Sequence, residues 1–219
     1  MNLLIIGAPG TGKGTMSSLI INDYDVVHVS TGDMLREAIA DATEVGLLAK
    51  SFMEKGQLVP DETIHNVIYE YFKKNSLTKG FLFDGYPRTV AQAEDFDKLL
   101  ASLGMKLDKV LYLSMDDEAL KDRITGRRVC PSCNAIYHIS NKPSKVEGVC
   151  DECGGTLVQR SDDTVEALNK RLDAFYKQTK PVVDYYDKVG LVSYINSDQK
   201  TEDVYKDIKK ALEEVKWLL

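Results

Sequence analysis

The chain has 219 residues, 43% of them hydrophobic, and carries 28 Lys and Arg against 34 Asp and Glu, a formal net charge of −6. This length and apolar content predict one folded domain, or one core with inserts, and exclude a disordered chain. The acidic balance argues against a general nucleic-acid-binding protein, which needs positive charge for the phosphate backbone. No apolar run approaches the roughly 20 residues of a membrane-spanning helix, and the first residues do not fit a signal peptide. We therefore expect a cytoplasmic protein without nucleic-acid or membrane partners.

Five short apolar runs are expected to form strands, at residues 2–6, 26–30, 81–84, 109–115 and 191–196. Continuous runs of this kind are typical of parallel strands that are buried on both faces. Between them apolar residues recur at helical spacing, most clearly in two sets: Ile64, Val67, Ile68, Tyr71 and Phe72, and Val204, Ile208, Leu212 and Val215. The alternation predicts an α/β fold, a five-stranded parallel sheet flanked by helices.

Some helix ends can be predicted from local patterns. Two pairs have the spacing of a capping box with the first residue as the cap: Thr89 with Gln92, and Asp163 with Glu166. Gly104 and Gly190 stand where glycines commonly end helices.

Two stretches interrupt the alternation of strands and helices. Residues 31–60 are expected to form short helices joined through Gly46 and Gly56, which makes them a helical insert. Residues from about 127 to 163 contain the four cysteines and no long apolar run, so we expect a second insert with its own small framework.

A glycine-rich stretch at residues 7–15 follows the first expected strand and opens the first expected helix. Its sequence is Gly-Ala-Pro-Gly-Thr-Gly-Lys-Gly-Thr. It contains G-x-x-x-x-G-K, in which glycines let backbone N–H groups converge on an anion and Lys13 reaches the β and γ phosphates. This predicts a P-loop NTPase rather than a glycine-rich turn with an exposed lysine. Gly14 replaces the usual Ser or Thr, with Thr15 one place later, so we expect carboxylates, acting through water, to orient Mg²⁺.

The cysteines have the spacing of a metal site: Cys130-x-x-Cys133, sixteen residues, then Cys150-x-x-Cys153. This spacing is typical of a Cys₄ zinc site with no open position, which predicts a structural metal that folds a small insert. A redox pair and structural disulfides are the weaker alternatives. His138 lies near the cluster and is expected to be a surface or packing residue.

Four more stretches complete the pattern: residues 30–36 (Ser-Thr-Gly-Asp-Met-Leu-Arg), 55–61 (Lys-Gly-Gln-Leu-Val-Pro-Asp), 83–88 (Phe-Asp-Gly-Tyr-Pro-Arg) and 126–128 (Gly-Arg-Arg). Together with the loop they resemble, over essentially the whole chain, the adenylate kinase family of nucleoside monophosphate kinases. The four-cysteine insert resembles the long zinc-bearing lid of some bacterial members. The resemblance implies reversible phosphoryl transfer from ATP to AMP, giving two ADP, with Mg²⁺ and a structural Zn²⁺. It also implies a core of residues 1–29, 60–126 and 164–219, an NMP-binding insert at 30–59 and a lid at 127–163.

The resemblance assigns roles to individual residues. The residues implied to bind ATP are Gly10, Thr11, Gly12, Lys13, Gly14, Thr15, Arg123, Arg127, Ile136, Tyr137 and Gln199. Those implied to bind AMP are Thr31, Arg36, Gln57, Leu58, Val59, Gly85, Tyr86, Pro87, Arg88, Gln92, Arg160 and Arg171. The implied catalytic residues are Lys13, Asp84, Arg88, Arg123, Arg127, Arg160 and Arg171. Six of the seven arginines fall on these phosphate positions, and Arg128 is expected on the lid surface.

Several assignments have alternatives. Asp33 and Asp84 are candidates for orienting Mg²⁺-bound water, but they also suit a helix cap or a turn. Gln92 could simply close a capping box onto Thr89. Gly126 and the region of Thr164 are expected hinges of the lid.

The rival functions are a sister kinase with UMP or CMP as acceptor or GTP as donor, a nucleic-acid-binding zinc ribbon, and a hydrolysing NTPase switch. A monomer is expected because no stretch suggests a spare hydrophobic interface.

Overall fold

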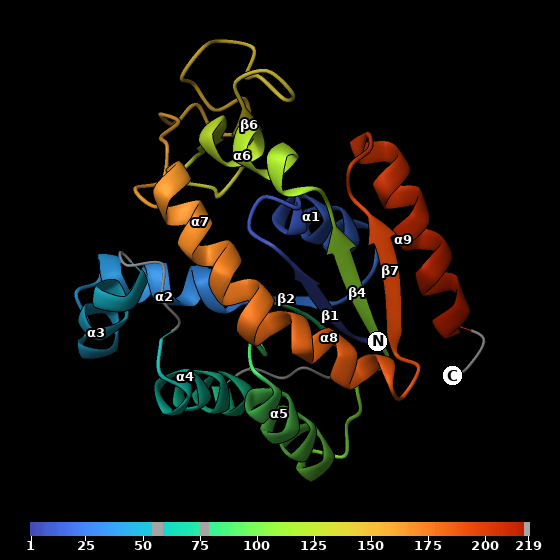
Figure 1. Ribbon diagram of the computed structural model, residues 1–219. Helices are drawn as coiled ribbons and strands as arrows, with labels where there is room; N and C mark the ends of the chain where they lie inside the picture. Colours follow the sequence, from blue (N-terminus) through green and yellow to red (C-terminus); the bar gives the residue numbers. More distant parts are fainter. Residues whose placement is uncertain (54–58, 75–78, 217–219) are drawn as a thin grey trace.

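Five parallel strands form the centre of the fold in the order β2-β3-β1-β4-β7 (Figure 1). The computed structural model describes residues 1–53, 59–74 and 79–216. The strands are β1 (Asn2–Gly7), β2 (Val27–Ser30), β3 (Phe81–Asp84), β4 (Lys109–Ser114) and β7 (Val192–Asn196). The predicted five-stranded parallel sheet is confirmed, with each strand end within one residue of its expected place.

Successive residues of the strands alternate between two hydrophobic clusters. Leu4 and Phe83 belong to the cluster on one face, whereas Leu3 and Leu82 belong to the cluster on the other. Because side chains alternate along a strand, burying both faces requires continuous apolar runs. This is why the strands can be recognised in the sequence without an alternating polar pattern.

Helices cover both faces of the sheet. On one face, residues of α1 (Lys13–Asp23) and α9 (Thr201–Lys216) pack against the sheet. The other cluster takes residues from α4 (Asp61–Lys74), α5 (Val90–Ser102), α6 (Asp117–Thr125), α7 (Val165–Ala174) and α8 (Lys180–Asp187). A π-helix (Phe175–Thr179) joins α7 to α8, and the run crosses in front of the sheet in Figure 1. The helical periods of α4 and α9 are confirmed: Ile68, Ile208 and Leu212 are fully buried.

The helix caps agree with the sequence in part. Thr89 caps α5, since its Oγ1 accepts a hydrogen bond from Gln92 N at 3.2 Å. The prediction for Asp163 is wrong: Thr164 caps α7, with its Oγ1 accepting from Ala167 N at 3.1 Å. The Asp163 carboxylate instead binds Arg127. Gly104 and Gly190 follow α5 and α8 with positive φ, as expected.

The first insert is a pair of helices, α2 (Thr31–Ala40) and α3 (Glu44–Met53). The helices are joined at residues 41–43, where Ala42 has φ 51°, so the expected joint at Gly46 is wrong, and Gly56 lies outside the described residues. Gly46 is a buried residue within α3, where a Cβ would lie 2.0 Å from the Ala38 carbonyl oxygen. Glycine is therefore needed there for close helix packing.

The second insert contains the small antiparallel pair β5 (Arg127–Val129) and β6 (Ile136–His138). It lies at the top of Figure 1, and the α2–α3 pair lies at the left. Among the described residues, no helix combines the length and apolar character needed to cross a membrane.

Replacing Gly46 with Ala is expected to lower the free energy of unfolding by about 2 kcal/mol, because the added methyl group meets backbone rather than a movable side chain. Denaturant unfolding and amide hydrogen exchange of α2 and α3 measure the effect. Gly104→Ala is the control, since that site is open and the change costs only the positive φ. Equal losses for the two variants would contradict the packing role of Gly46.

Candidate functional site

The loop between β1 and α1 has the conformation of an anion-binding loop. Gly10 and Gly12 have φ of 93° and 87°, in the left-handed region that favours glycine. A Cβ at Gly7 would lie 2.6 Å from Thr11 Oγ1 and 2.7 Å from the Leu113 carbonyl oxygen. Thr11 is buried, and its hydroxyl donates to the Ala8 carbonyl oxygen at 2.9 Å. The loop is therefore tightly folded at the N-terminus of α1, where backbone N–H groups favour an anion.

Lys13 lies across this loop. Its ammonium donates to the carbonyl oxygens of Gly7 at 2.8 Å and Ala8 at 3.2 Å. Burial is the main reason that the pKa of Lys13 is lowered to about 8. The negative charge of Asp84 opposes this shift, whereas the positive charges of nearby arginines, Arg171 above all, add to it. A phosphate placed here would relieve an unfavourable positive charge.

Five arginines from separate segments come close enough to act on one another. Burial, and then the charge of Arg171, lowers the pKa of Arg88 to about 10. Burial, and then the charges of Arg36 and Arg127, lowers the pKa of Arg160 to about 10. The pKa of Arg171 is lowered as well, chiefly by burial. These groups come from α2, the loop after β3, the second insert and α7, and together with Lys13 they form one positively charged centre.

Carboxylates and carbonyl oxygens hold these cations. Arg127 Nε donates to Asp163 Oδ2 at 2.9 Å, and its Nη2 binds the other oxygen, so the pair is bidentate. Arg171 Nη1 donates to Asp162 Oδ2 at 2.9 Å. Sequence reasoning missed both acidic partners, because the only local pattern, a capping box, assigned Asp163 another role.

The two candidate carboxylates for magnesium differ in their surroundings. Asp33 pairs with Arg36 in the first turn of α2. Its alternative as a helix cap is wrong, because Ser30 caps α2 by accepting from Asp33 N at 3.2 Å. Asp84 ends β3 and acts electrostatically on Lys13 and Arg88. Carboxylate oxygens suit Mg²⁺, and Asp84 is the carboxylate whose charge opposes the lowering of the Lys13 pKa.

The loop after β3 brings three of the expected AMP residues together. Gly85 has φ 89°, and a Cβ there would lie 2.8 Å from Thr31 Oγ1 and 3.2 Å from Arg88 Nη2. Arg88 Nε donates to the Gly85 carbonyl oxygen at 2.7 Å. Thr31 is buried at the start of α2. The sequence-predicted glycine therefore allows a close approach of α2 and Arg88.

The remaining expected AMP residues are distributed as follows. Tyr86 is buried, precedes the cis peptide bond to Pro87, and donates its hydroxyl to the Gln92 carbonyl oxygen at 3.3 Å. Val59 is buried in the core, and Gln57 and Leu58 lie outside the described residues.

The Gln92 side chain does not close a capping box onto Thr89. Its Oε1 accepts from Arg88 N at 2.7 Å, and its Nε2 donates to Asp61. The capping-box alternative is therefore wrong for this side chain. Sequence reasoning also missed Asp61, because its position at the start of α4 indicates no more than a favourable helix-end charge.

The second insert reaches the loop through Ile136. A Cβ at Gly14 would lie 2.9 Å from Ile136 Cδ1, so β6 covers the first turn of α1. Tyr137 points the other way: it is buried, and its hydroxyl accepts from Asp151 N at 2.8 Å. The Tyr137 side chain is therefore used within the insert, and the ATP contact expected of this residue stays a prediction.

Two expected ATP residues meet the segment that follows β7: Arg123 reaches it from α6, and Gln199 belongs to it. Arg123 Nη2 donates to the Ser197 carbonyl oxygen at 3.1 Å, and its guanidinium lies near Gly12. The Gln199 amide donates to the Asn196 carbonyl oxygen at 3.0 Å and to Asp207 at 2.7 Å. Arg128 donates to the Thr125 and Arg127 carbonyl oxygens at the end of α6.

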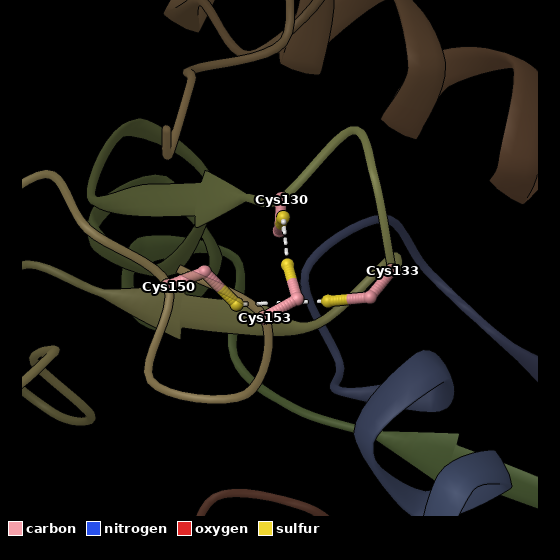
Figure 2. Close-up of side chains that lie close together, drawn as sticks. All are labelled: Cys130, Cys133, Cys150 and Cys153. Atoms are coloured by element: carbon pink, nitrogen blue, oxygen red, sulfur yellow. Dashed lines mark hydrogen bonds between the residues drawn. The ribbon is translucent and has the colours of Figure 1, made fainter. Parts of the chain in front are cut away.

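The four cysteine side chains converge in the second insert (Figure 2). Their sulfur atoms all lie within 4.8 Å of one another, with Cys130 and Cys153 3.4 Å apart and Cys133 and Cys150 3.5 Å apart. Sulfurs of a tetrahedral zinc site are about 3.8 Å apart. All four are free thiols, so the disulfide alternative is not what the structure contains. The hydroxyl of Tyr137 lowers the pKa of Cys150 and so favours the metal-binding thiolate.

His138 is a packing residue, as expected. Its Nδ1 accepts from Ser140 N and Asn141 N, both at 3.1 Å, so its Nε2 carries the proton and donates to the Asp122 carbonyl oxygen at 3.0 Å. A Cβ at Gly126 would lie 2.3 Å from Nε2. Nε2 therefore ties the second insert to the end of α6, and Nδ1 holds the turn that follows β6.

Comparisons with known proteins agree with this site. The family model described as adenylate kinase matches residues 5–191. The adenylate kinase of Caldanaerobacter subterraneus subsp. tengcongensis is 49% identical over 212 residues, which cover 97% of this chain and 96% of that protein. The adenylate kinase of Carboxydothermus hydrogenoformans is 49% identical over 213 residues, 97% of this chain and 100% of that protein. The adenylate kinase of Bacillus pumilus is 47% identical over 212 residues, 97% and 98% of the two chains.

Proposed function

The chain belongs to the adenylate kinase family, and on this basis we propose the role of each site residue in the reaction. The protein is an ATP:AMP phosphotransferase that converts ATP and AMP reversibly into two ADP. The observation that carries the assignment of residues is the positively charged centre, in which Lys13 and arginines from both inserts and the core act on one another. Two nucleotides that meet through their phosphates need such a centre.

On the donor side, the backbone N–H groups of residues 10–15 and Lys13 hold the ATP phosphates. Arg123 and Arg127 contact ATP and the transferred phosphoryl group. Ile136, which covers Gly14, and the main chains of Tyr137 and Gln199 border the base. These roles follow the family, and the contacts of Arg123 and Ile136 with the loop support them.

On the acceptor side, Arg36 and Arg88 grip the AMP phosphate, and Arg160 and Arg171 reach it and the moving phosphoryl group from the lid side. Thr31, Gln92 and residues 57–59 hold the base and ribose, while Gly85 and its neighbours Tyr86 and Pro87 shape the loop. The close approach of Thr31, Gly85 and Arg88 supports this division.

Transfer needs little covalent help from the protein. An AMP phosphate oxygen is already anionic, so no general base is required, and the barrier falls when the two phosphates are aligned and their charge is neutralised. Mg²⁺, bound with ATP, supplies further charge neutralisation. We place Asp84 at this ion through water, since it is the carboxylate that acts on Lys13.

The inserts exclude water from the transferred group. Residues 127–163 are the lid, residues 30–59 are the NMP-binding insert, and residues 1–29, 60–126 and 164–219 are the core. Closing them removes the water that otherwise competes as acceptor. Gly126 and the region of Thr164 are the hinges of the lid.

The metal of the lid is zinc in a structural role. Four thiolates leave no position for substrate or water, and the hydrophobic cluster of the lid has only three buried residues, Cys130, Tyr137 and Cys150. The protein works as a cytoplasmic monomer, a setting in which thiols stay reduced for metal binding.

Steady-state assays with ATP and AMP, CMP, UMP or GMP test the acceptor, and a second series replaces ATP with GTP. The kcat/KM for AMP with ATP is expected to exceed that of every other pair by orders of magnitude. A higher value for CMP or UMP would make the protein a sister kinase, and hydrolysis of ATP without any acceptor would indicate an NTPase switch.

Arg88→Ala is expected to lower kcat/KM for AMP by about 100-fold or more, because it removes a charge that neutralises the acceptor phosphate. Its effect on the melting temperature is expected to be small, since the buried guanidinium is repelled by Arg171. Kinetics and calorimetry of the same preparation measure both quantities. A near-normal rate would contradict the placement of Arg88 on the acceptor phosphate.

Removing the metal is expected to lower the melting temperature, because the lid has few apolar residues to fold without it. The melting temperature of the purified protein is measured before treatment with a chelator strong enough to remove zinc, after that treatment, and again after zinc is added back. An unchanged melting temperature would show that the Cys₄ metal is not structural.

A further inference from the structure

The Gln92 side-chain amide is held at both ends. Its Oε1 accepts from the backbone N–H of Arg88 at 2.7 Å, and its Nε2 donates to Asp61 Oδ1. Gln92 lies in the first turn of α5 and is only 4% exposed, Arg88 lies in the loop after β3, and Asp61 is the first residue of α4. Two partners, one from the loop after β3 and one from α4, therefore fix the Gln92 amide.

The two partners require the same orientation of that amide. Turning a glutamine amide by 180° exchanges its acceptor oxygen with its donor nitrogen. The Arg88 N–H can only donate and so requires the oxygen, whereas the Asp61 carboxylate accepts and so requires the nitrogen. The reversed amide would set two donors against each other at Arg88 and two acceptors against each other at Asp61.

Asp61 is itself anchored to the start of α5. Its other oxygen, Oδ2, lies 3.4 Å from the donor hydroxyl of Thr89, the residue that caps α5. The carboxylate of this exposed residue thus spans Thr89 and Gln92, which holds one of its oxygens against the Gln92 amide. Glu62 is the other acidic residue in the first turn of α4.

The amide still has one N–H and one oxygen lone pair to offer to a ligand. Adenine presents an acceptor at N1 beside a donor at its 6-amino group, which matches an amide of fixed orientation. Hypoxanthine presents the reverse, a donor at N1 and an acceptor at O6, and matches only the turned amide.

We propose that Asp61 is a specificity-determining positioning residue: by fixing the Gln92 amide, it makes the acceptor site select a 6-amino purine over a 6-oxo purine. The inference rests on the proposed contact of Gln92 with the AMP base. Asp61 acts through Gln92 and need not touch the nucleotide.

The test compares AMP with inosine monophosphate as acceptors for Asp61→Ala. The ratio of kcat/KM for AMP to that for inosine monophosphate is expected to fall about tenfold, as for the loss of a hydrogen bond to a charged group. The KM for AMP should rise while the KM for ATP stays unchanged. Asp61→Asn keeps an acceptor oxygen and is expected to restore most of the ratio.

Glu62→Ala is the matched control, because it removes a charge from the same helix turn and should leave the ratio at the wild-type value. A ratio that falls as far in Glu62→Ala as in Asp61→Ala would overturn the proposal in favour of a helix-end effect. A wild-type ratio in Asp61→Ala, even with a lower melting temperature or lower rates for both acceptors, would also overturn it.

Gln92→Leu separates this inference from the function on which it rests. If it lowers the ratio while Asp61→Ala does not, the role of Asp61 alone is wrong. If Gln92→Leu leaves the ratio unchanged, the contact of Gln92 with the AMP base is wrong, and the inference is overturned with it.

Discussion

Positive charge collects at the carboxyl ends of the parallel strands, and burial makes that charge costly. Lys13, Arg88, Arg160 and Arg171 all have pKa values below their ordinary range, first because they are buried and then because other cations lie near them. The same repulsion favours a ligand with several negative charges, since phosphates relieve it. The site therefore gives up folding stability in exchange for binding and transition-state stabilisation.

The cations are held in two ways. In the core, Lys13 and Arg88 bind the carbonyl oxygens of their own loops, so each cation also stabilises the loop that carries it. Towards the lid, Arg127 and Arg171 bind the carboxylates of Asp163 and Asp162. These pairs lie where the lid joins the core, so the electrostatics of the site and the attachment of the lid depend on the same side chains.

Local patterns in the sequence were sufficient for much of this structure. The strands, the phosphate loop, the cap at Thr89 and the cysteine cluster each depend on residues that are close in sequence. The wrong predictions have a different cause, namely contacts between residues that are distant in the sequence or that form only when helices pack. Asp163 has capping spacing, but a guanidinium 36 residues away takes its carboxylate. Gly46 looked like a joint because its close contact with Ala38 forms only when two helices pack. No local pattern connects residues 61 and 92.

Gly14 connects two features of the loop: the missing Ser or Thr hydroxyl after Lys13, and the cover of the loop by β6. A serine or threonine at this position would offer a hydroxyl to magnesium, but its Cβ would lie 2.9 Å from Ile136 Cδ1, so the end of the Ile136 side chain would have to shift. The hydrogen atom of glycine lets β6 lie directly over the first turn of α1. The missing hydroxyl and the close cover by β6 therefore both depend on the glycine at this position. Asp84, at the end of the neighbouring strand β3 and close enough to act on Lys13, is the carboxylate that we propose for orienting Mg²⁺ in place of that hydroxyl.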